Sequence, residues 1–337
     1  MRVGIDARKI ADFGIGTYIR GLLRGLVALN ARDEYVAFAP KDAKLPDGVE
    51  HVTVDAPHYS LRELFIVGRA ANRARLDVFH APHYVVPFTN VPVVVTVHDL
   101  IHLHQPQRNP FAKPYARVML KRAVHKARCM LTVSNAVKEQ LERELGAKRV
   151  IVTPNGVDVP RVSAGDNEGD AYFLYVGNDK PHKNVSTLVE AAKRADVRLV
   201  LAGAAFERFD GVERRGFVSD EALAELYANA LALVMPSLEE GFGLPAAEAM
   251  AHGTAVITSN DAALVEITGD AALHVDARDA GALAAAMQRV ASDASLRAQL
   301  GALGRQRAAR FTWKRCAELT RDAYEEARFR GTSWNVG

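Results

Sequence analysis

Cysteine is scarce in this 337-residue sequence, which contains only Cys129 and Cys316. Because the two lie far apart, they form neither a zinc-ligand spacing nor a CxxC redox pair, and a disulfide framework is excluded. The N-terminal stretch MRVGIDARKI has no apolar signal core. Residues 78–98 lack Asp, Glu, Lys and Arg, yet three prolines interrupt them and exclude a membrane-spanning helix. We therefore expect a cytoplasmic protein that is neither exported nor membrane-spanning.

The sequence also lacks the signatures of nucleic-acid binding, since it has neither an aromatic-and-basic RNP-like string nor a zinc-finger spacing. The net charge of +3 is unevenly distributed. Residues 1–160 contain 23 Lys and Arg against 15 Asp and Glu, whereas residues 161–337 contain 20 against 25. The basic first half therefore predicts an anionic partner other than nucleic acid.

Apolar segments of strand length alternate with segments of helical periodicity along the whole chain. Val-rich runs such as 91–98 are typical of parallel strands buried on both faces, with helices as crossovers. With 49% apolar residues, the chain can bury two cores. A polar stretch near 159–170 separates two such series and is interpreted as a linker. The predicted fold class is α/β, with two doubly wound, Rossmann-like domains facing across a ligand-binding cleft.

The strongest local motif is EGFGLPAAE at 240–248, which follows an apolar strand and begins a helix. Pro245 suits the first helical turn, because proline lacks the amide hydrogen that this turn leaves unpaired. Two glycines allow a tight turn whose amides, together with the positive helix end, suit a diphosphate. Glu240 and Glu248 flank that position and suit sugar and ribose hydroxyls. The alternative is an ordinary helix N-terminus with surface acids.

Further motifs accompany it along the chain: GIGTYIRGL at 14–22, VHDL at 97–100, TVSNAV at 132–137, PNGVD at 154–158 and YVG with a downstream KN at 175–184. Together these segments resemble the retaining glycosyltransferases of family 4, which have the GT-B fold, and the GIGTYIRGL and HDL forms are similar to the mannosyltransferase-like branch. The resemblance covers nearly the whole chain. It implies an acceptor-side domain over 1–158, a nucleotide-sugar-binding domain over 159–315 and a last helix within 316–337 that crosses back to the first domain.

The resemblance also implies roles for residues of two glycine-containing motifs. It implies that Glu248 binds the ribose hydroxyls of the donor nucleotide and that Glu240 contacts the transferred sugar. Gly16 would lie beside the donor phosphate or the acceptor, although on spacing alone its motif equally fits a simple turn. The backbone amides that would receive the β-phosphate or sugar hydroxyls are those around Phe242, Gly243 and Leu244.

Lys183 follows the end of a predicted strand, where a cation can neutralise a leaving diphosphate. Without the resemblance, it would be interpreted as a solvated lysine at a helix start. Members of the family commonly carry Arg directly after the glycine, whereas here Gly177 is followed by Asn178 and the loop is one residue shorter. Either Lys180 supplies the missing charge of this donor-binding loop, or Lys183 acts alone.

His98 ends the most hydrophobic predicted strand, and other histidines lie near it in the sequence. A metal cluster is one interpretation, yet no cysteine and no helical H-x3-H spacing supports it. The resemblance instead implies that His98 lies near the donor sugar. Asp-x-Asp, the metal-diphosphate clamp of the other main glycosyltransferase fold, is absent. We therefore expect catalysis without a metal or other cofactor.

The segment from Leu100 to Lys138 contains eight Lys or Arg and no Asp or Glu. Arg117, Lys121, His125 and Arg128 are predicted to form one basic helical stripe, and the predicted helix 61–75 adds further cations. These side chains form either an ordinary solvated face or a surface for an anionic membrane or a polyprenyl-diphosphate acceptor. The candidate residues of this surface are Arg69, Arg73, Arg117, Lys121 and Arg128.

These observations favour a retaining hexosyltransferase that acts at the inner face of the membrane in polysaccharide or lipopolysaccharide assembly. GDP-mannose is the first expected donor, and a polyprenyl-diphosphate-linked saccharide is the expected acceptor. Lys183 would stabilise the departing diphosphate, while Glu240 and His98 would orient the oxocarbenium-like sugar. The alternatives are a GT-B nucleotide-sugar epimerase or phosphorylase, and a non-catalytic, membrane-associated nucleotide-sugar-binding protein.

Overall fold

The computed structural model describes residues 1–29, 32–57, 60–105, 111–158 and 171–329. The predicted linker near 159–170 lies outside this part of the chain. Two compact domains are present: Met1–Gly156 with the segment from Thr312 onward, and Val157–Phe311. The second domain thus ends at Phe311 rather than at the predicted residue 315, because Trp313 is already buried in the core of the first domain.

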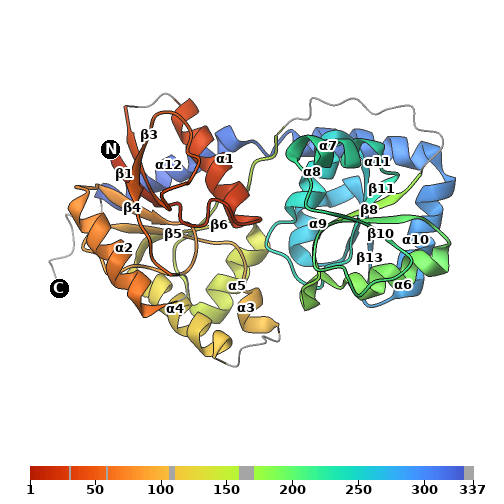
Figure 1. Ribbon diagram of the computed structural model, residues 1–337, viewed down its shortest axis with the longest axis horizontal. Coiled ribbons are helices and arrows are strands. Elements are labelled where there is room, and N and C mark those ends of the chain that lie inside the picture. The colour runs from red at the N-terminus through yellow and green to blue at the C-terminus, as the bar shows by residue number, and fades with distance from the viewer. Residues whose placement is uncertain (30–31, 58–59, 106–110, 159–170, 330–337) are drawn as a thin grey trace. The chain divides into compact units, whose positions relative to one another are not determined.

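The first domain is built on a seven-stranded parallel sheet in the order β3-β2-β1-β4-β5-β6-β7 (Figure 1). Its strands are β1 (Arg2–Asp6), β2 (Glu34–Ala39), β3 (Val49–Thr53), β4 (Val78–Ala81), β5 (Val93–Val97), β6 (Ala127–Thr132) and β7 (Val150–Val152). The central strands β4 and β5 are buried along their whole length, as their continuous apolar sequences predict for strands covered on both faces.

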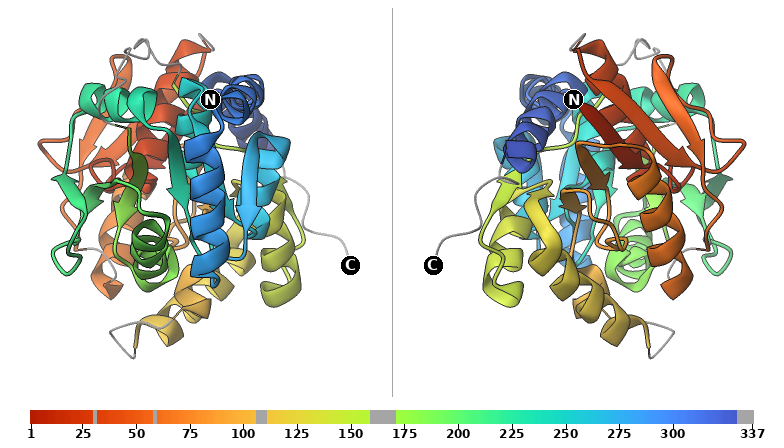
Figure 2. Two further views of the ribbon diagram at one scale, coloured as in Figure 1. Left: turned by 90° about the vertical axis from the view of Figure 1, so that its right-hand side faces the viewer. Right: turned by 90° about the vertical axis from the view of Figure 1, so that its left-hand side faces the viewer.

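Helices cover both faces of this sheet, which faces the viewer in the right-hand panel of Figure 2. They are α1 (Ile15–Ala28), α2 (Leu61–Arg73), α3 (Ile101–His104), α4 (Ala112–Lys126), α5 (Asn135–Leu145) and α12 (Trp313–Phe329). Helices α1 and α12 share a core with Val94, whereas α2, α4 and α5 pack on the face of Val93 and Val95. A Cβ atom added at Gly21 of α1 would lie 2.2 Å from the Trp313 ring, so this glycine permits the close packing of α12 on α1.

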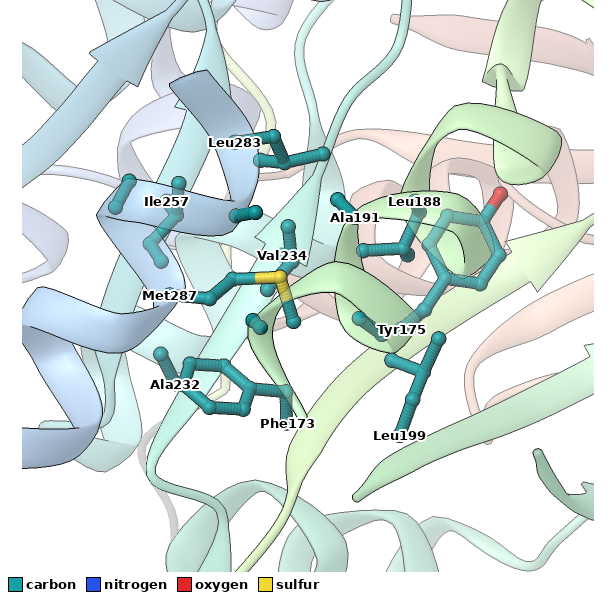
Figure 3. Close-up of a cluster of buried hydrophobic side chains, with 14 of the residues drawn as sticks. Phe173, Tyr175, Leu188, Ala191, Leu199, Ala232, Val234, Ile257, Leu283 and Met287 are labelled. Carbon is teal, nitrogen blue, oxygen red and sulfur yellow. The ribbon is translucent and has the colours of Figure 1, made fainter. Parts of the chain in front are cut away.

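The second domain repeats the design with a six-stranded parallel sheet in the order β10-β9-β8-β11-β12-β13. Its strands are β8 (Phe173–Asn178), β9 (Leu199–Ala204), β10 (Glu213–Gly216), β11 (Ala232–Met235), β12 (Ala255–Ser259) and β13 (Ala272–Val275). Its α-helices are α6 (Val185–Ala195), α7 (Asp220–Asn229), α8 (Leu244–His252), α9 (Ala262–Thr268), α10 (Ala280–Ser292) and α11 (Ala294–Ala308). Figure 3 shows part of the core, in which Met287 of α10 and Leu188 of α6 pack against Phe173 and Val234 of the sheet.

Both sheets have the Rossmann strand order. In each, the chain moves outward over three strands and then returns to the other side of its first strand, so that the order reverses between β1 and β4 and between β8 and β11. Ligands of such sheets bind at the carboxyl ends of the strands beside this reversal. The candidate ligand-binding segments are therefore the loops that follow β1 and β4 in the first domain and those that follow β8 and β11 in the second.

The prediction that Arg128 shares a helical stripe with Arg117 and Lys121 is wrong. Helix α4 ends at Lys126, because Ala127 has an extended backbone and begins β6 beside β5. Arg128 therefore lies on a strand, whereas Arg117, Lys121 and His125 of the predicted stripe remain on the helix.

Candidate functional site

The loops after β8 and β11 are held together by Asn184, which the sequence analysis did not single out as a site residue. Asn184 has a left-handed backbone, with φ of 56°, between the 3₁₀ turn η1 (Pro181–Lys183) and α6. Its side-chain amide donates to the carbonyl of Pro236 at 3.2 Å and to that of Ala277 at 2.6 Å. The Leu238 amide also donates to the His182 carbonyl at 2.7 Å. These bonds fix the position of Lys183 relative to the loop that contains Glu240.

Lys183 and Glu240 form an ion pair across the two loops. The Lys183 ammonium donates to Glu240 Oε1 at 2.5 Å, and both side chains are largely buried. A buried charge requires a partner, and each of these side chains supplies the opposite charge that the other needs. An arriving diphosphate would offer Lys183 a second anionic partner, and the hydroxyls of a sugar would offer hydrogen-bond donors to Glu240.

The turn before α8 has the geometry that its glycines predict. Gly243 caps the helix with φ of 88°, and a Cβ atom at this position would lie 2.5 Å from Leu264. The first turn of α8 has amides without intrahelical partners, which suit an anion. The Phe242 side chain is buried edge-on against Phe311, so it can contribute only its backbone to a ligand, and Leu244 begins the helix.

Glu248 lies on α8 and accepts a hydrogen bond from the Tyr227 hydroxyl at 2.8 Å through Oε2. Burial raises the pKa of Glu248 to about 7; the charges of Asp220 and Asp158 add to this increase, while the Tyr227 hydrogen bond opposes it. Tyr227 thus occupies one carboxylate oxygen, and the remaining acceptor capacity suits vicinal hydroxyls such as those of ribose.

Asp261 is a further site residue that the sequence analysis did not find. Its carboxylate caps α9 by accepting from the amides of Ala263 and Leu264 at 3.1 and 3.2 Å. Burial raises the pKa of Asp261 to about 6, and the charge of nearby Glu240 adds to this effect, although the amide hydrogen bonds oppose it. An aspartate directly before an apolar helical segment is the N-cap signal that would have located it.

The loop after β8 contains the two remaining donor-side candidates. The Asn178 side chain accepts from the Lys180 amide at 3.3 Å and so shapes the loop. The Lys180 side chain is exposed, and no partner for its ammonium group occurs within the described ranges. Its neighbour Asp179 is paired with Arg208, which also donates to Ser186 at 3.0 Å. Lys180 and Lys183 therefore differ: the first is exposed and unpaired, and the second is buried and paired.

In the first domain, Gly14 caps α1 with φ of 62°, and Gly16 is buried in the first turn of the helix. A Cβ atom on Gly16 would lie 2.6 Å from the Ile10 carbonyl. Glycine is therefore required at this position because the backbone of the preceding loop approaches it closely.

His98 directly follows β5 and is partly buried. Its Nε2 lies 3.0 Å from the Pro82 carbonyl, which can only accept, so Nε2 carries the proton. Burial lowers the pKa of His98 to about 4; the Pro82 hydrogen bond opposes this change, and nearby His83 adds to it. The ring is therefore neutral at pH 7, and Nδ1 presents a lone pair that can accept a hydroxyl proton.

The other histidines near His98 have separate partners. His102 lies 3.0 Å from the Tyr84 hydroxyl, His104 lies 2.8 Å from Glu144, and His80 lies between Tyr324 and Thr96. Within the described ranges, no three His, Cys, Asp or Glu side chains are grouped so that they could share a metal ion.

The candidate membrane or acceptor residues are exposed, but on different elements. Arg69 and Arg73 lie on α2, Arg117 and Lys121 on α4, and Arg128 on β6. Apolar side chains are also exposed on α2, where Leu61 and Phe65 are 66% and 63% exposed. The Phe65 ring centroid lies 4.8 Å from that of Phe88, over which the Arg122 guanidinium lies at 4.3 Å. We call Leu61, Arg62, Phe65, Ile66, Arg69 and Phe88 the α2 surface.

In the part of the chain that the structure describes, no helix is both long enough and apolar enough to span a membrane.

The two Rossmann-like domains, the phosphate-suited turn and the paired Lys183 and Glu240 at the strand reversal define the class, a glycosyltransferase of GT-B fold. Residues 14–161 match the family model described as Glycosyltransferase Family 4, and residues 159–307 match that of Glycosyl transferases group 1. The chain is 31% identical over 281 residues to the O-antigen chain mannosyltransferase B of Escherichia coli, with 74% of each chain covered. The chain therefore belongs to glycosyltransferase family 4.

A further relative is a mannosyltransferase by name, and solved structures share the fold of this chain. The chain is 30% identical over 308 residues to the MMP alpha-(1->4)-mannosyltransferase of Mycolicibacterium hassiacum, with 80% of this chain and 74% of the relative covered. Among solved structures, sucrose-phosphate synthase from Thermosynechococcus elongatus superposes with a TM-score of 0.82 at 22% identity, covering 98% and 100% of the two chains. WaaG, a glycosyltransferase involved in lipopolysaccharide biosynthesis, superposes with a TM-score of 0.74 at 15% identity over 100% of each chain.

Proposed function

We propose that the protein transfers mannose from GDP-mannose, with retention of configuration, to a lipid-linked saccharide. The observation that carries this proposal is the Lys183–Glu240 ion pair beside the α8 turn, at the strand reversal of the second domain. The choice of mannose is supported by relatives that are themselves named mannosyltransferases.

The proposed chemistry follows from the charges that develop during transfer. As the bond from C1 to the diphosphate oxygen breaks, negative charge grows on the diphosphate, next to the Lys183 ammonium and the amides that precede α8. Glu240 and His98 accept hydrogen bonds from sugar hydroxyls and orient the ring, while Glu248 binds the ribose. The acceptor hydroxyl attacks C1 from the face that the diphosphate leaves, and its proton passes to a departing phosphate oxygen.

Lys183 and the helix terminus supply fixed positive charge where the diphosphate would lie, so the proposed reaction uses no metal ion. The acceptor belongs to the first domain, whose exposed cations on α2 and α4 are complementary to a diphosphate or an anionic membrane.

A thermal-shift panel with nucleotides and nucleotide sugars tests the donor. A ligand at 100 times its dissociation constant stabilises a protein by about 2.7 kcal/mol, so GDP and GDP-mannose should raise the Tm by several degrees, with EDTA present. Larger shifts with UDP, UDP-glucose or a UDP-N-acetylhexosamine would contradict the choice of base. Shifts that require Mg²⁺ would contradict the metal-free site.

A further inference from the structure

Four fully buried polar side chains form a continuous chain through the core of the first domain. The Tyr324 hydroxyl of α12 lies 2.6 Å from His80 Nδ1, and His80 Nε2 lies 2.8 Å from the Thr96 hydroxyl. Thr96 in turn lies 3.0 Å from the Tyr18 hydroxyl of α1. The four side chains come from α12, β4, β5 and α1, so the chain of hydrogen bonds runs along the face of the sheet that these two helices cover.

This chain of hydrogen bonds destabilises the fold unless every member is paired, because a buried polar group without a hydrogen bond is unfavourable. Burial lowers the pKa of His80 to about 3, with smaller contributions from His98 and His83, so the ring is neutral at pH 7. A neutral imidazole donates through one nitrogen and accepts through the other, which gives the chain a single direction from end to end. Loss of one hydroxyl therefore leaves its neighbour unpaired.

The chain of hydrogen bonds ends at Tyr18, whose ring contacts the His98 ring. The Tyr18 ring is edge-on to the His98 ring, with centroids 4.7 Å apart and planes at 78°. The Pro82 carbonyl holds His98 at Nε2, so the Tyr18 ring is the second constraint on the orientation of this imidazole. Together they set the direction in which Nδ1 presents its lone pair.

We propose that Tyr324, acting through His80 and Thr96, holds Tyr18 against His98 and thereby positions His98 Nδ1 as the acceptor for a sugar hydroxyl. Tyr324 and Tyr18 are positioning residues: neither needs to touch the substrate. This inference rests on the proposed role of His98. It also gives α12 a part in the reaction through Tyr324, which is 244 residues distant from His80 in the sequence.

A double-mutant cycle tests the proposal, because residues that act through one another show non-additive effects. Tyr324→Phe, which keeps the ring and removes the hydroxyl, should lower kcat/KM for the donor at least fivefold. In a His98→Ala background the same change should cost less than twofold. Tyr35→Phe removes a hydroxyl from another tyrosine of the same core and serves as the control, with less than twofold loss in both backgrounds.

Equal losses in both backgrounds would overturn the proposal, since they indicate a general structural effect. Wild-type kcat/KM in His98→Ala would overturn the role of His98 itself. If Tyr324→Phe does not fold, Thr96→Val breaks the same chain between His80 and Tyr18 with little change in volume.

An NMR measurement gives a result that is independent of transfer. The ring-proton resonances of His98, which the Tyr18 ring current shifts, should move in Tyr324→Phe and stay in place in Tyr35→Phe. Unchanged resonances in Tyr324→Phe would overturn the proposal, whereas failure of the donor panel would overturn the proposed function alone.

Discussion

At the scale of single residues, the carboxyl group of Glu248 is subject to two opposing influences. Burial raises its pKa to about 7, and the Tyr227 hydroxyl at 2.8 Å stabilises the charged form. The folded protein therefore binds a proton that the unfolded chain, with an ordinary glutamate pKa near 4.3, has released. As the pH rises from about 4 through 7, Glu248 progressively destabilises the fold.

Glu248→Gln should separate binding from stability. It should raise the free energy of unfolding at pH 8 by about 1–3 kcal/mol, with a smaller gain at pH 5. It should also weaken GDP binding by about 1.5–3 kcal/mol, because a charged acceptor for the ribose hydroxyls is lost. Denaturant unfolding and calorimetry measure the two effects, and Glu225→Gln on the exposed side of α7 is the control. Unchanged GDP affinity would contradict the ribose role.

The two lysines of the β8 loop allow a second comparison. Lys183→Ala should lower kcat by about 100-fold or more, equivalent to about 2.7 kcal/mol, with a smaller loss of donor binding. Lys180→Ala should cost less than about tenfold, because Lys180 is exposed and Asn184 does not fix its position. Steady-state kinetics on folded variants decides: the reverse ranking would assign the leaving-group charge to Lys180, and near-normal kcat in both would assign it to the α8 turn.

At the scale of elements, periodicity was sufficient to predict the strands and most helices. Apolar runs that alternate with helical segments indicate parallel strands buried on both faces, and β4, β5, β8 and β11 lie where those runs are. The short helices α3 and α9 were not predicted, because four and seven residues are too few for a periodic pattern. The end of α4 was misplaced, since basic residues occur equally on helices and at the start of β6.

The candidate site was only partly predictable for a similar reason. Glu240, Glu248 and Lys183 belong to local motifs, so the sequence indicated them directly. Asp261 has a local N-cap signal, but its proximity to Glu240 does not; Asn184 joins loops that are distant in the sequence, and Tyr227 meets Glu248 only after α7 and α8 have packed. Such pairings depend on tertiary structure, which no local pattern contains.

The α2 surface makes a prediction about membranes at this scale. Exposed Leu61 and Phe65, on the same helix as Arg62 and Arg69, suit an interface that is apolar and anionic, and each cation contributes about 1 kcal/mol. The protein should bind vesicles that contain phosphatidylglycerol more tightly than neutral ones. The double variant Arg62→Glu with Arg69→Glu should weaken this binding at least tenfold.

Arg289→Glu on the exposed face of α10, in the second domain, is the control and should lose less than threefold. Co-sedimentation with phosphatidylglycerol and phosphatidylcholine vesicles measures the affinities. Equal binding to both vesicle types, or equal loss in both sets of variants, would contradict a role for the α2 surface.

At the scale of the whole molecule, two domains of one topology divide the proposed work. The second domain contains the ion pair, the helix turn and the carboxylate proposed to bind the ribose, all at one strand reversal. The first domain contributes His98, the buried hydroxyl chain and the exposed cations. Helix α12 follows the second domain in the sequence and is part of the core of the first, so the first domain is completed only by the last segment of the chain.

The most direct test of this account is the configuration of the transferred sugar. The purified protein, supplied with GDP-mannose, EDTA and lipid-linked saccharides extracted from the membranes of its source, should form a mannoside whose one-bond C1–H1 NMR coupling identifies the α-anomer, the configuration of the donor. A β-linked product would contradict the same-face mechanism. Donor binding without any transfer would contradict the assignment of Lys183, Glu240 and His98 to a catalytic site.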